Sequence, residues 1–345
     1  WDSFDTNASE IVRFNQPGSS AWALNRVLSN SATKFDGSLF ANGNVAIVNR
    51  HGIHFGPNSV LDVGGLIASS ADISNDNFMN GRFDFDKPGV SDAMVTNAGR
   101  ISVRDTGLAA LVAPGVENSG YIQANLGTVI LGAGETHSID FRGDGLINFT
   151  LTSPTRATPK KEDGSDADAL VSNKGKIVAD GGSIVMTASQ ASRVLDQSIN
   201  MSGIAQANSV GVRNGRIVLG GGRTGKVRVT GKVLARVELP KAGEDIPVPP
   251  TRGGTVHITG EEVEIASGAE VDVSGANGGG TALIGGAKHG ATLDDDSTIG
   301  YLDGGDGSYS ILLGDNAGAA GNGFMPLADS LLIEAGATID ASSTD

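Results

Sequence analysis

Between Asn44 and Ser69 the chain alternates short apolar runs with small clusters of turn residues. The runs are Val45–Val48, Ile53–Phe55, Val60–Val63 and Leu66–Ala68, and the residues between them are mostly Gly, Asn and Pro. No helix of ordinary length fits between such closely spaced breaks, and the β-branched residues of the runs favour strands. The pattern therefore predicts consecutive short strands that turn at tight corners.

A five-residue phrase, Asn-x-Gly-x-Ile, recurs along the chain. It lies at Asn97–Ile101, Asn118–Ile122 and Asn173–Ile177, and a shortened copy lies at Asn214–Ile217. The first two copies begin 21 positions apart (118 − 97). A spacing of this size is a sign of a repeat architecture. We expect the Asn side chains to occupy equivalent corners and to bond to one another along a ladder.

A second repeat lies nearer the C-terminus, where Val263–Ser274 aligns without gaps on Leu331–Ser342 at an offset of 68 (331 − 263). We interpret this offset as three units of about 22 to 23 residues. A unit of this length with three short strands is one coil of a parallel β-helix, whose coils stack ~4.8 Å apart. The prediction is an all-β, right-handed parallel β-helix of about 15 coils and ~70 Å, with residues such as Ile101 and Val103 inside.

Several segments interrupt this pattern. Residues 153–168 and the loop at 238–252 are charged and rich in Pro, which indicates excursions from the rod. Apolar residues at helical spacing predict a short helix at Met186–Ile199, and we expect a second at Trp22–Leu28. An open rod end is an exposed sheet edge, so residues 1–35, which hold both tryptophans, are the expected N-terminal cap.

Composition and charge narrow the class of protein. The 345 residues include 51 Gly and no Cys, with a net charge of −14. The Gly content suits tight corners, and the acidic balance argues against a nucleic-acid partner, because phosphate binding needs a basic surface. No run of 18 apolar residues predicts a transmembrane helix. The chain starts at Trp1 without a basic leader and ends at Asp345 inside a repeat phrase, so we expect a removed or absent leader and further coils beyond the end.

Three motifs resemble known binding sites. Gly220–Lys226 fits the start of a phosphate-binding loop, but Val227 follows where Ser or Thr is needed, so a corner between coils is favoured. Arg142–Asp144 is an Arg-Gly-Asp tripeptide. Tyr301–Ser308, near Asp294–Asp296, approximates a calcium-binding repeat out of frame, and a solvated acidic loop is favoured. The five histidines show no metal spacing. We predict no cofactor and no enzyme activity.

Charge is unevenly distributed along the chain. Between residues 213 and 236 there are seven cations and no acid, namely Arg213, Arg216, Arg223, Lys226, Arg228, Lys232 and Arg236. From Glu261 to Asp345 there are fifteen acids and one Lys. The cations alternate with apolar residues at strand spacing, which favours an exposed strand face over a catalytic groove. A third hypothesis lies between these two: the cations form a patch that binds an anionic glycan but does not catalyse a reaction.

Several linked stretches resemble the haemagglutination-activity, or two-partner-secretion (TPS), domain of filamentous haemagglutinin and related exported adhesins. The matching segments are Phe14–Pro17, Leu24–Val27, Gly52–Ile53, Phe55–Gly56, Val63–Ser69, Gly107–Glu135, Gly143–Phe149 and Thr187–Asn208. In the family an Asn-Pro-Asn-Gly-Ile turn leads into the stretch that begins at Phe55–Gly56, whereas here the turn reads Asn49-Arg50-His51-Gly52-Ile53. The resemblance covers residues 1–235, and 236–345 are expected to continue as adhesin-type β-helix repeats.

The resemblance implies a function in export. Residues 1–235 would be the N-terminal secretion domain of a large adhesin of a Gram-negative bacterium, which passes through the periplasm to the cell surface and seeds β-helix folding for adhesion or biofilm. The implied partner is an outer-membrane β-barrel transporter with POTRA domains. Asn49, Gly52 and Ile53 hold the matching motif positions and are the candidates for transporter recognition, although a corner needed only for folding is an equal alternative. The isolated domain is expected to be a monomer.

Two other classes of function stay open at this point. Many parallel β-helices are polysaccharide lyases or glycosidases, so a polysaccharide-binding or polysaccharide-degrading protein is the first alternative. The second is the N-terminal part of a two-partner-secreted toxin or haemolysin, because toxins are carried by the same route. A host or bacterial surface ligand, protein or glycan, would lie in later repeats.

Overall fold

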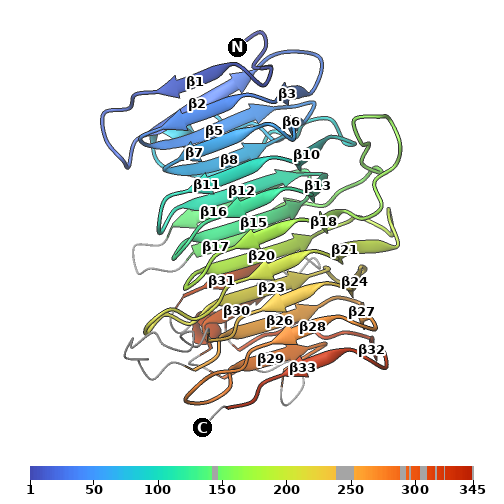
Figure 1. Ribbon diagram of the computed structural model, residues 1–345. Coiled ribbons are helices and arrows are strands. Elements are labelled where there is room, and N and C mark those ends of the chain that lie inside the picture. Colours follow the sequence, from blue (N-terminus) through green and yellow to red (C-terminus); the bar gives the residue numbers. More distant parts are fainter. Residues whose placement is uncertain are drawn as a thin grey trace.

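The computed structural model describes residues 1–141, 147–237, 252–287, 293–294, 297–303, 309–314, 317–321 and 323–343. They form the predicted right-handed parallel β-helix, with the N-terminus at one end of the rod and the C-terminus at the other (Figure 1). Three parallel sheets run along the rod, and each coil contributes one strand to each sheet. A fourth, antiparallel sheet lies outside the coils.

The bounds of the strands follow the order of the sheets. Sheet 1 contains β1 (Ile11–Phe14), β4 (Ser38–Ala41), β7 (Val60–Val63), β11 (Arg100–Val103), β14 (Tyr121–Gln123), β19 (Lys176–Val178), β22 (Ile204–Gln206), β25 (Lys232–Leu234), β28 (Glu270–Asp272) and β33 (Thr338–Asp340). Sheet 2 contains β2 (Trp22–Val27), β5 (Asn44–Asn49), β8 (Gly65–Ser69), β12 (Leu108–Ala113), β15 (Thr128–Ala133), β20 (Ser183–Ala188), β23 (Arg216–Gly220), β26 (Thr255–Thr259) and β29 (Thr281–Ile284). Sheet 3 contains β3 (Thr33–Phe35), β6 (Ile53–Phe55), β10 (Met94–Asn97), β13 (Gly115–Asn118), β18 (Val171–Asn173), β21 (Gln197–Met201), β24 (Lys226–Val229), β27 (Glu262–Ile265) and β32 (Ser330–Ile333).

The outer sheet has the order β30 (Ile299–Asp303), β31 (Tyr309–Leu313), β17 (Ile147–Ser153), β16 (Thr136–Phe141) and β9 (Phe83–Phe85). Two short helices, α1 (Asn75–Met79) and α2 (Ala317–Ala320), accompany it. Its strands leave the rod after β8, β15 and β29, which all belong to sheet 2. Because every departure starts from the same sheet, the outer strands gather over that sheet's outer face.

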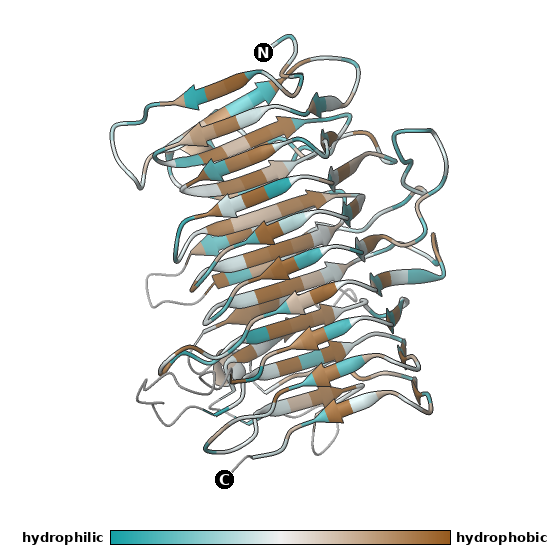
Figure 2. Ribbon diagram, in the orientation of Figure 1, coloured by the Kyte–Doolittle hydropathy of each residue, from teal (hydrophilic) through white to brown (hydrophobic). Residues whose placement is uncertain are grey.

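Sheet 2 is consequently buried on both faces. Its inward residues, such as Leu66, Val129 and Ile184, join the core inside the coils. Its outward residues, such as Ile130 and Val185, pack in a second cluster with the outer sheet. This explains why its strands are continuous apolar runs, whereas strands of sheet 1 alternate buried and exposed positions. Figure 2 shows the resulting hydrophobic bands repeated from coil to coil.

The N-terminal cap is built differently from the prediction. Residues 1–35 supply β1, β2 and β3, the first strands of all three sheets, and are therefore an ordinary first coil. The open end is closed by the segment before β1, where Phe4 stacks on Phe35 at 5.7 Å between ring centroids. Trp22 lies outside the coils against Phe83 at 4.8 Å. The helix predicted at Trp22–Leu28 is wrong, because both faces of this segment are covered and it pairs as a strand with β5.

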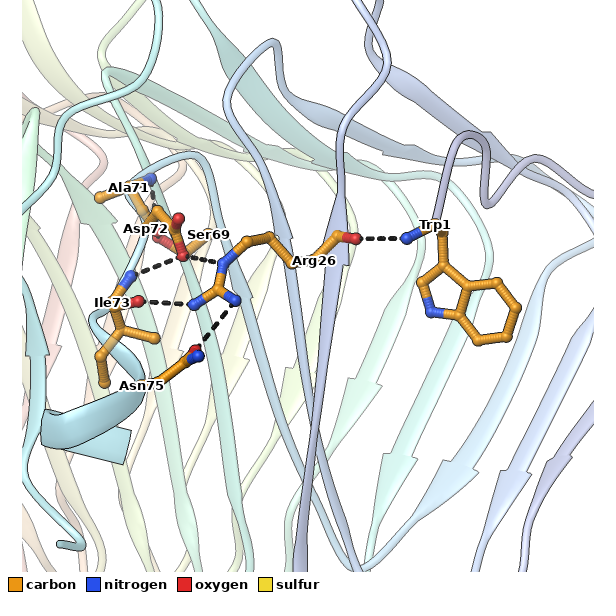
Figure 3. A network of polar contacts seen from close by, with 7 residues as sticks. All are labelled: Trp1, Arg26, Ser69, Ala71, Asp72, Ile73 and Asn75. Carbon is orange, nitrogen blue, oxygen red and sulfur yellow. Dashed lines mark hydrogen bonds and ion pairs between the residues drawn. The ribbon is translucent and has the colours of Figure 1, made fainter. Parts of the chain in front are cut away.

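An Arg26-centred network fixes this first coil to the outer layer (Figure 3). Nε of Arg26 donates to Asp72 at 2.7 Å, and its two terminal nitrogens donate to the Ile73 carbonyl and to Asn75. The backbone carbonyl of Arg26 accepts from the N-terminal amine of Trp1 at 2.8 Å. Through Arg26, the segment Leu24–Val27 of β2 is thus linked to the chain start and to the beginning of α1.

The helix predicted at Met186–Ile199 is also wrong. Its beginning belongs to β20 and its end to β21, with an irregular connection between them. The apolar positions that suggested one helix face have separate partners. Met186 pairs with Leu131 across sheet 2, whereas Ile199 pairs with Val171 across sheet 3. Helical spacing here is a coincidence of two strands that meet at a corner.

The predicted asparagine ladder is confirmed for three copies. Nδ2 of Asn97 donates to Oδ1 of Asn118, and Nδ2 of Asn118 donates to Oδ1 of Asn173, both at 2.8 Å. The shortened copy at Asn214 does not join them, because it precedes β23 of sheet 2. The residue stacked on Asn173 is Met201.

We expect Asn118→Ala to lower the free energy of unfolding by about 2 to 4 kcal/mol, because it leaves buried amide groups on both neighbours without their partner. Urea denaturation of the purified chain measures this loss. Ser119→Ala, at the exposed neighbouring position, is the control and should change stability little. Equal losses in the two variants would show that the ladder contributes nothing specific.

The 68-residue offset has a different origin from the one predicted. Val263 pairs directly with Leu331, so the two similar segments lie on adjacent coils. The chain between them contains β29 and the outer hairpin β30–β31 rather than two further coils. Such excursions consume residues without lengthening the rod. The described part has ten coils, counted in sheet 1, and a length of ~45 Å, so the predicted 15 coils and ~70 Å are wrong.

Candidate functional site

The turn Asn49–Gly52, which joins β5 to β6, has a buried polar core. The side chain of Asn49 has no exposed surface. Its Nδ2 donates to the Ser31 carbonyl at 3.0 Å and to Oγ1 of Thr33 at 2.9 Å, while its Oδ1 accepts from the His51 amide at 2.9 Å. One side chain therefore ties the turn to the coil before it. An Ala at this position would leave buried groups unpaired.

Gly52 and Ile53 are equally enclosed. Gly52 has a φ of +107°, and a Cβ built on it would lie 2.4 Å from the carbonyl oxygen of Met94. Only glycine fits this corner, because another residue would both strain the backbone and collide with a neighbouring chain segment. Ile53 is fully buried in the core inside the coils. None of the three candidate recognition residues presents its side chain on the folded surface.

The segment around Pro88–Val90 contacts the turn directly, because the Val90 amide donates to the Arg50 carbonyl at 2.8 Å. The excursion at 153–168 lies next to it, where Glu162 forms a salt bridge of 2.6 Å with Lys34 of β3. The amide of Lys160 donates to the Asp92 carbonyl at 2.9 Å. A cavity of about 280 Å³ remains beneath, lined among others by His51 and His54. Burial lowers the pKa of His54, whose Nδ1 lies 2.9 Å from Oγ1 of Thr96. Arg50 is the exposed residue of the turn.

The seven cations do not share one face. Arg216 belongs to sheet 2, Lys226 and Arg228 to sheet 3 and Lys232 to sheet 1, while Arg213, Arg223 and Arg236 lie outside the strands. Residues 213–236 therefore do not form the continuous groove that a long glycan would need. Gly220–Lys226, the phosphate-loop candidate, joins β23 to β24 as the predicted corner.

Four of these cations face carboxylates of the next coil. Lys226 and Arg228 both contact Glu264, at 2.5 and 2.7 Å. Lys232 contacts Glu270 at 2.5 Å, and Arg236 contacts Asp272 at 3.1 Å. The pairing follows from the register, because Arg228 stands directly opposite Glu264 and Lys232 opposite Glu270. The two cations hold the pKa of the Glu264 carboxyl below its usual range. A cationic coil is thus stacked on an acidic one.

A double-mutant cycle between Arg228 and Glu264 should show a favourable coupling of about 1 kcal/mol. The carboxylate is nearly buried, but the guanidinium is half exposed, so solvent screening limits the coupling. The measurement is urea unfolding of wild type, Arg228→Ala, Glu264→Ala and the double variant. The exposed pair Lys34–Glu162 is the control cycle and should show no measurable coupling at physiological salt. Additive losses at Arg228 and Glu264 would contradict an ionic match between the coils.

Two other candidate motifs stay predictions. Arg142–Asp144 lies outside the described residues, and so does most of Tyr301–Ser308, together with Asp295 and Asp296. Within the described ranges no group of three His, Asp or Glu side chains is placed to hold a metal ion. The same ranges contain no helix that is long and apolar enough to cross a membrane.

Sequence reasoning missed the features that depend on register and on the outer layer. The sequence holds only a partial signal for the carboxylate partners of the cations, because a gapless alignment of Lys226–Val229 with Glu262–Ile265 places Arg228 opposite Glu264. The same alignment fails for Lys232 and Glu270, since the corner before β28 is two residues longer than the corner before β25. Two fully buried histidines, His137 and His257, gave no sequence signal. His137 belongs to β16 of the outer sheet, His257 lies in β26 of sheet 2 against Tyr301 of the outer sheet, and burial lowers the pKa of each to about 3.

Comparisons with known proteins agree with this architecture. The model of the TPS secretion domain family matches residues 1–234. Two heme/hemopexin-binding proteins of Haemophilus influenzae are similar to the chain. One, from strain Rd, is 30% identical over 227 residues, which cover 64% of this chain and 23% of that protein. The other is 25% identical over 231 residues, covering 64% and 24%. The chain thus spans about a quarter of the length of the curated relatives it matches.

A solved structure is similar over the whole chain. It is the crystal structure of the HMW1 secretion domain from Haemophilus influenzae, with a TM-score of 0.72 and 28% sequence identity, and the match covers 100% of this chain and 76% of that one. A family match over residues 1–234 and this structural likeness point to the same class of protein. The chain therefore belongs to the TPS secretion domain family and is a secretion domain of an exported, two-partner-secreted protein.

Proposed function

We propose that this domain directs its chain through a dedicated outer-membrane transporter, a β-barrel with periplasmic POTRA domains, and that the transporter reads the turn Asn49–Ile53 before the domain folds. The observation that supports this proposal most is the burial of Asn49, Gly52 and Ile53. A partner that needs these side chains must meet them in the unfolded chain. Once β5 and β6 are in their coils, the same residues serve the corner.

Folding outside the cell would then retain the exported chain. A repeat stack gains stability one coil at a time, so a coil that has formed outside opposes the return of the chain through a narrow pore. The first coil is closed by Phe4 and fixed by Arg26, which suits a segment that nucleates the stack. No nucleotide hydrolysis is needed for this direction of transport.

We further infer that the exported protein is a surface adhesin of a Gram-negative bacterium, active in adhesion or biofilm formation, and that this domain is not an enzyme. The resemblance to adhesins and the stacked, repetitive coils favour this assignment. The anionic-glycan patch at Arg213–Arg236 is a weaker proposal, because four of its cations already face carboxylates. A monomer is the expected state of the isolated domain.

The export proposal is tested with two variants that lose the same hydrogen bond. Asn49→Ala and Thr33→Val both break the bond from Nδ2 of Asn49 to Oγ1 of Thr33, but only Asn49→Ala removes a residue of the turn motif. Surface export is measured in cells that express the transporter, and the melting temperature is measured on purified protein. We expect at least a tenfold loss of export for Asn49→Ala and little loss for Thr33→Val.

Further buried bonds of Asn49 will lower the melting temperature of Asn49→Ala more than that of Thr33→Val. Export of both variants is therefore compared at a temperature where each is fully folded once purified. If export falls only in proportion to the melting temperature in both variants, the turn is needed for folding alone and the recognition proposal is wrong.

A further inference from the structure

A cavity of about 390 Å³ lies between the rod and the outer layer, near the C-terminal end of the described coils. Its inner wall is the outer face of sheet 2, where Thr255 and His257 of β26 stand beside Thr281 and Leu283 of β29. Its other wall is the segment before β30, which includes Thr298. The cavity is distinct from the turn at Asn49–Gly52, which lies near the N-terminal end of the rod.

The lining differs from the apolar space around it. Elsewhere the layer between sheet 2 and the outer sheet is filled by residues such as Ile130, Val185 and Phe149. Around the cavity, hydroxyl groups of Thr255, Thr281, Ser297 and Thr298 replace them. The hydroxyl group of Ser297 donates to the Ile299 carbonyl, whereas that of Thr298 is buried without a partner. A purely structural contact between two sheets gains nothing from such an unpaired group, because it costs free energy.

Two polar atoms of the lining residues have no hydrogen-bond partner in the described structure: Nε2 of His257 and Oγ1 of Thr298. The other ring nitrogen of His257 is held at 3.1 Å from the Tyr301 hydroxyl, so the ring orientation is fixed. They come from opposite walls of the same cavity. Unpaired buried groups in native proteins usually indicate a water, an ion or a ligand that satisfies them.

The charges of the lining indicate the class of ligand. Arg252 and Asp294, both exposed, contribute one charge of each sign among the described lining residues. Burial keeps the His257 imidazole neutral, since its pKa is lowered to about 3. Leu283 and Leu293 supply an apolar surface. A lining with many hydroxyl groups, balanced charge and an apolar patch suits an uncharged ligand that has several hydroxyl groups and a hydrophobic ring face.

We propose that this cavity is a binding site for a neutral sugar unit of hexose to disaccharide size. Thr298 and His257 would exchange hydrogen bonds with its hydroxyl groups, and the leucines would contact its C–H face. A neutral imidazole can either donate or accept a hydrogen bond at Nε2, and the hydroxyl groups of a sugar can do the same. A carboxylated sugar would place its charge where only one exposed cation is available, so acidic sugars should bind more weakly. The proposal is independent of the export role.

The test is ligand-observed saturation-transfer NMR on the whole purified chain with methyl glycosides of glucose, galactose, mannose and N-acetylglucosamine, and with glucuronic acid as the charged comparison. At ~10 mM ligand, at least one neutral glycoside should receive saturation and raise the melting temperature. Thr298→Val, which keeps the shape and removes the hydroxyl, should weaken binding about tenfold. Thr224→Val, at an exposed position that does not line the cavity, is the matched control and should bind as wild type does.

Three results would overturn the proposal. The first is no saturation transfer to any neutral glycoside at ~10 mM, which would make the cavity a water-filled space. The second is unchanged binding in Thr298→Val, which would place the sugar elsewhere. The third is equal or tighter binding of glucuronic acid, which would show that the class of ligand is wrong.

Discussion

Lowering the pH from 7 to 5 is expected to reduce the free energy of unfolding by ~4 kcal/mol through two histidines alone. His137 and His257 are fully buried, and burial lowers the pKa of each from 6.5 to about 3. Above pH 6.5 both rings are neutral whether the chain is folded or not, so they contribute no pH dependence. Between pH 6.5 and about 3 the unfolded chain binds protons that the folded chain does not, so stability falls as the pH falls.

His137 provides the cleaner test of this expectation. Its ring stacks on Phe85 with centroids 4.5 Å apart, and neither ring nitrogen has a hydrogen-bond partner in the described structure. Phe at this position keeps the aromatic contact and cannot be protonated. We expect His137→Phe to be at least as stable as wild type at pH 7 and to lose stability about half as steeply between pH 6.5 and 5.

Urea unfolding at half-unit steps from pH 7.5 to 5 gives the two slopes, each histidine contributing ~1.4 kcal/mol per pH unit. Carboxylates held at low pKa, such as Glu264, add their own loss, but below pH 5. A slope in His137→Phe equal to that of wild type would mean that this histidine can be protonated in the folded state, and that the outer sheet opens at mild acidity.

The sequence predicted the coils well because their signals are local. The Asn97, Asn118 and Asn173 corners were found from a fixed phrase, and their stacking follows from the fixed rise between coils. Local signals cannot predict how many residues form an excursion between one coil and the next. The 68 residues between Val263 and Leu331 are one coil plus an excursion, and no periodicity distinguishes that from three coils.

The candidate site shows the same difference between local features, which the sequence predicts, and contacts between coils, which it does not. A tight corner at Asn49–Gly52 could be predicted from its residue types, and the burial of Asn49 could not, because its partner Thr33 belongs to the coil before it. Of the cations at Lys226–Arg236, Arg228 and Lys232 lie at exposed strand positions as predicted, whereas Arg236 lies outside the strands. Their pairing with Glu264 and Glu270 depends on which strand lies next, and that requires the register across residues 238–251.

The outer layer was the least predictable part. Segment Trp22–Val27 carries apolar residues on both faces, with Trp22 packed on Phe83 of β9, and from the sequence alone this segment was predicted to be a short helix. The sheet that covers it is assembled from strands up to 230 positions apart in the chain (313 − 83), joined by antiparallel pairing of β31 with β17 and of β16 with β9. His137 belongs to this layer, and His257 and the polar cavity lie against it, which is why none of them was foreseen.

Replacing Gly52 by Ala should be among the most destabilising single changes in this domain, with an expected loss of about 3 kcal/mol or more. Two costs add at this position. The backbone has a φ of +107°, and the new Cβ would lie 2.4 Å from the carbonyl oxygen of Met94, a backbone atom that cannot move without disturbing β10. The loss is measured by urea unfolding at pH 7.

Gly268→Ala separates these two costs. Gly268 lies in the corner after β27 with a φ of +81°, and a Cβ there would have open space around it. This variant carries the backbone strain alone, for which about 1 kcal/mol is expected. A much larger loss at Gly52 than at Gly268 would show that the close approach of Met94 demands a glycine in the turn. Comparable losses would mean that the corner can relax around a side chain. The glycine of the motif would then be better explained by recognition of the unfolded chain than by the fold.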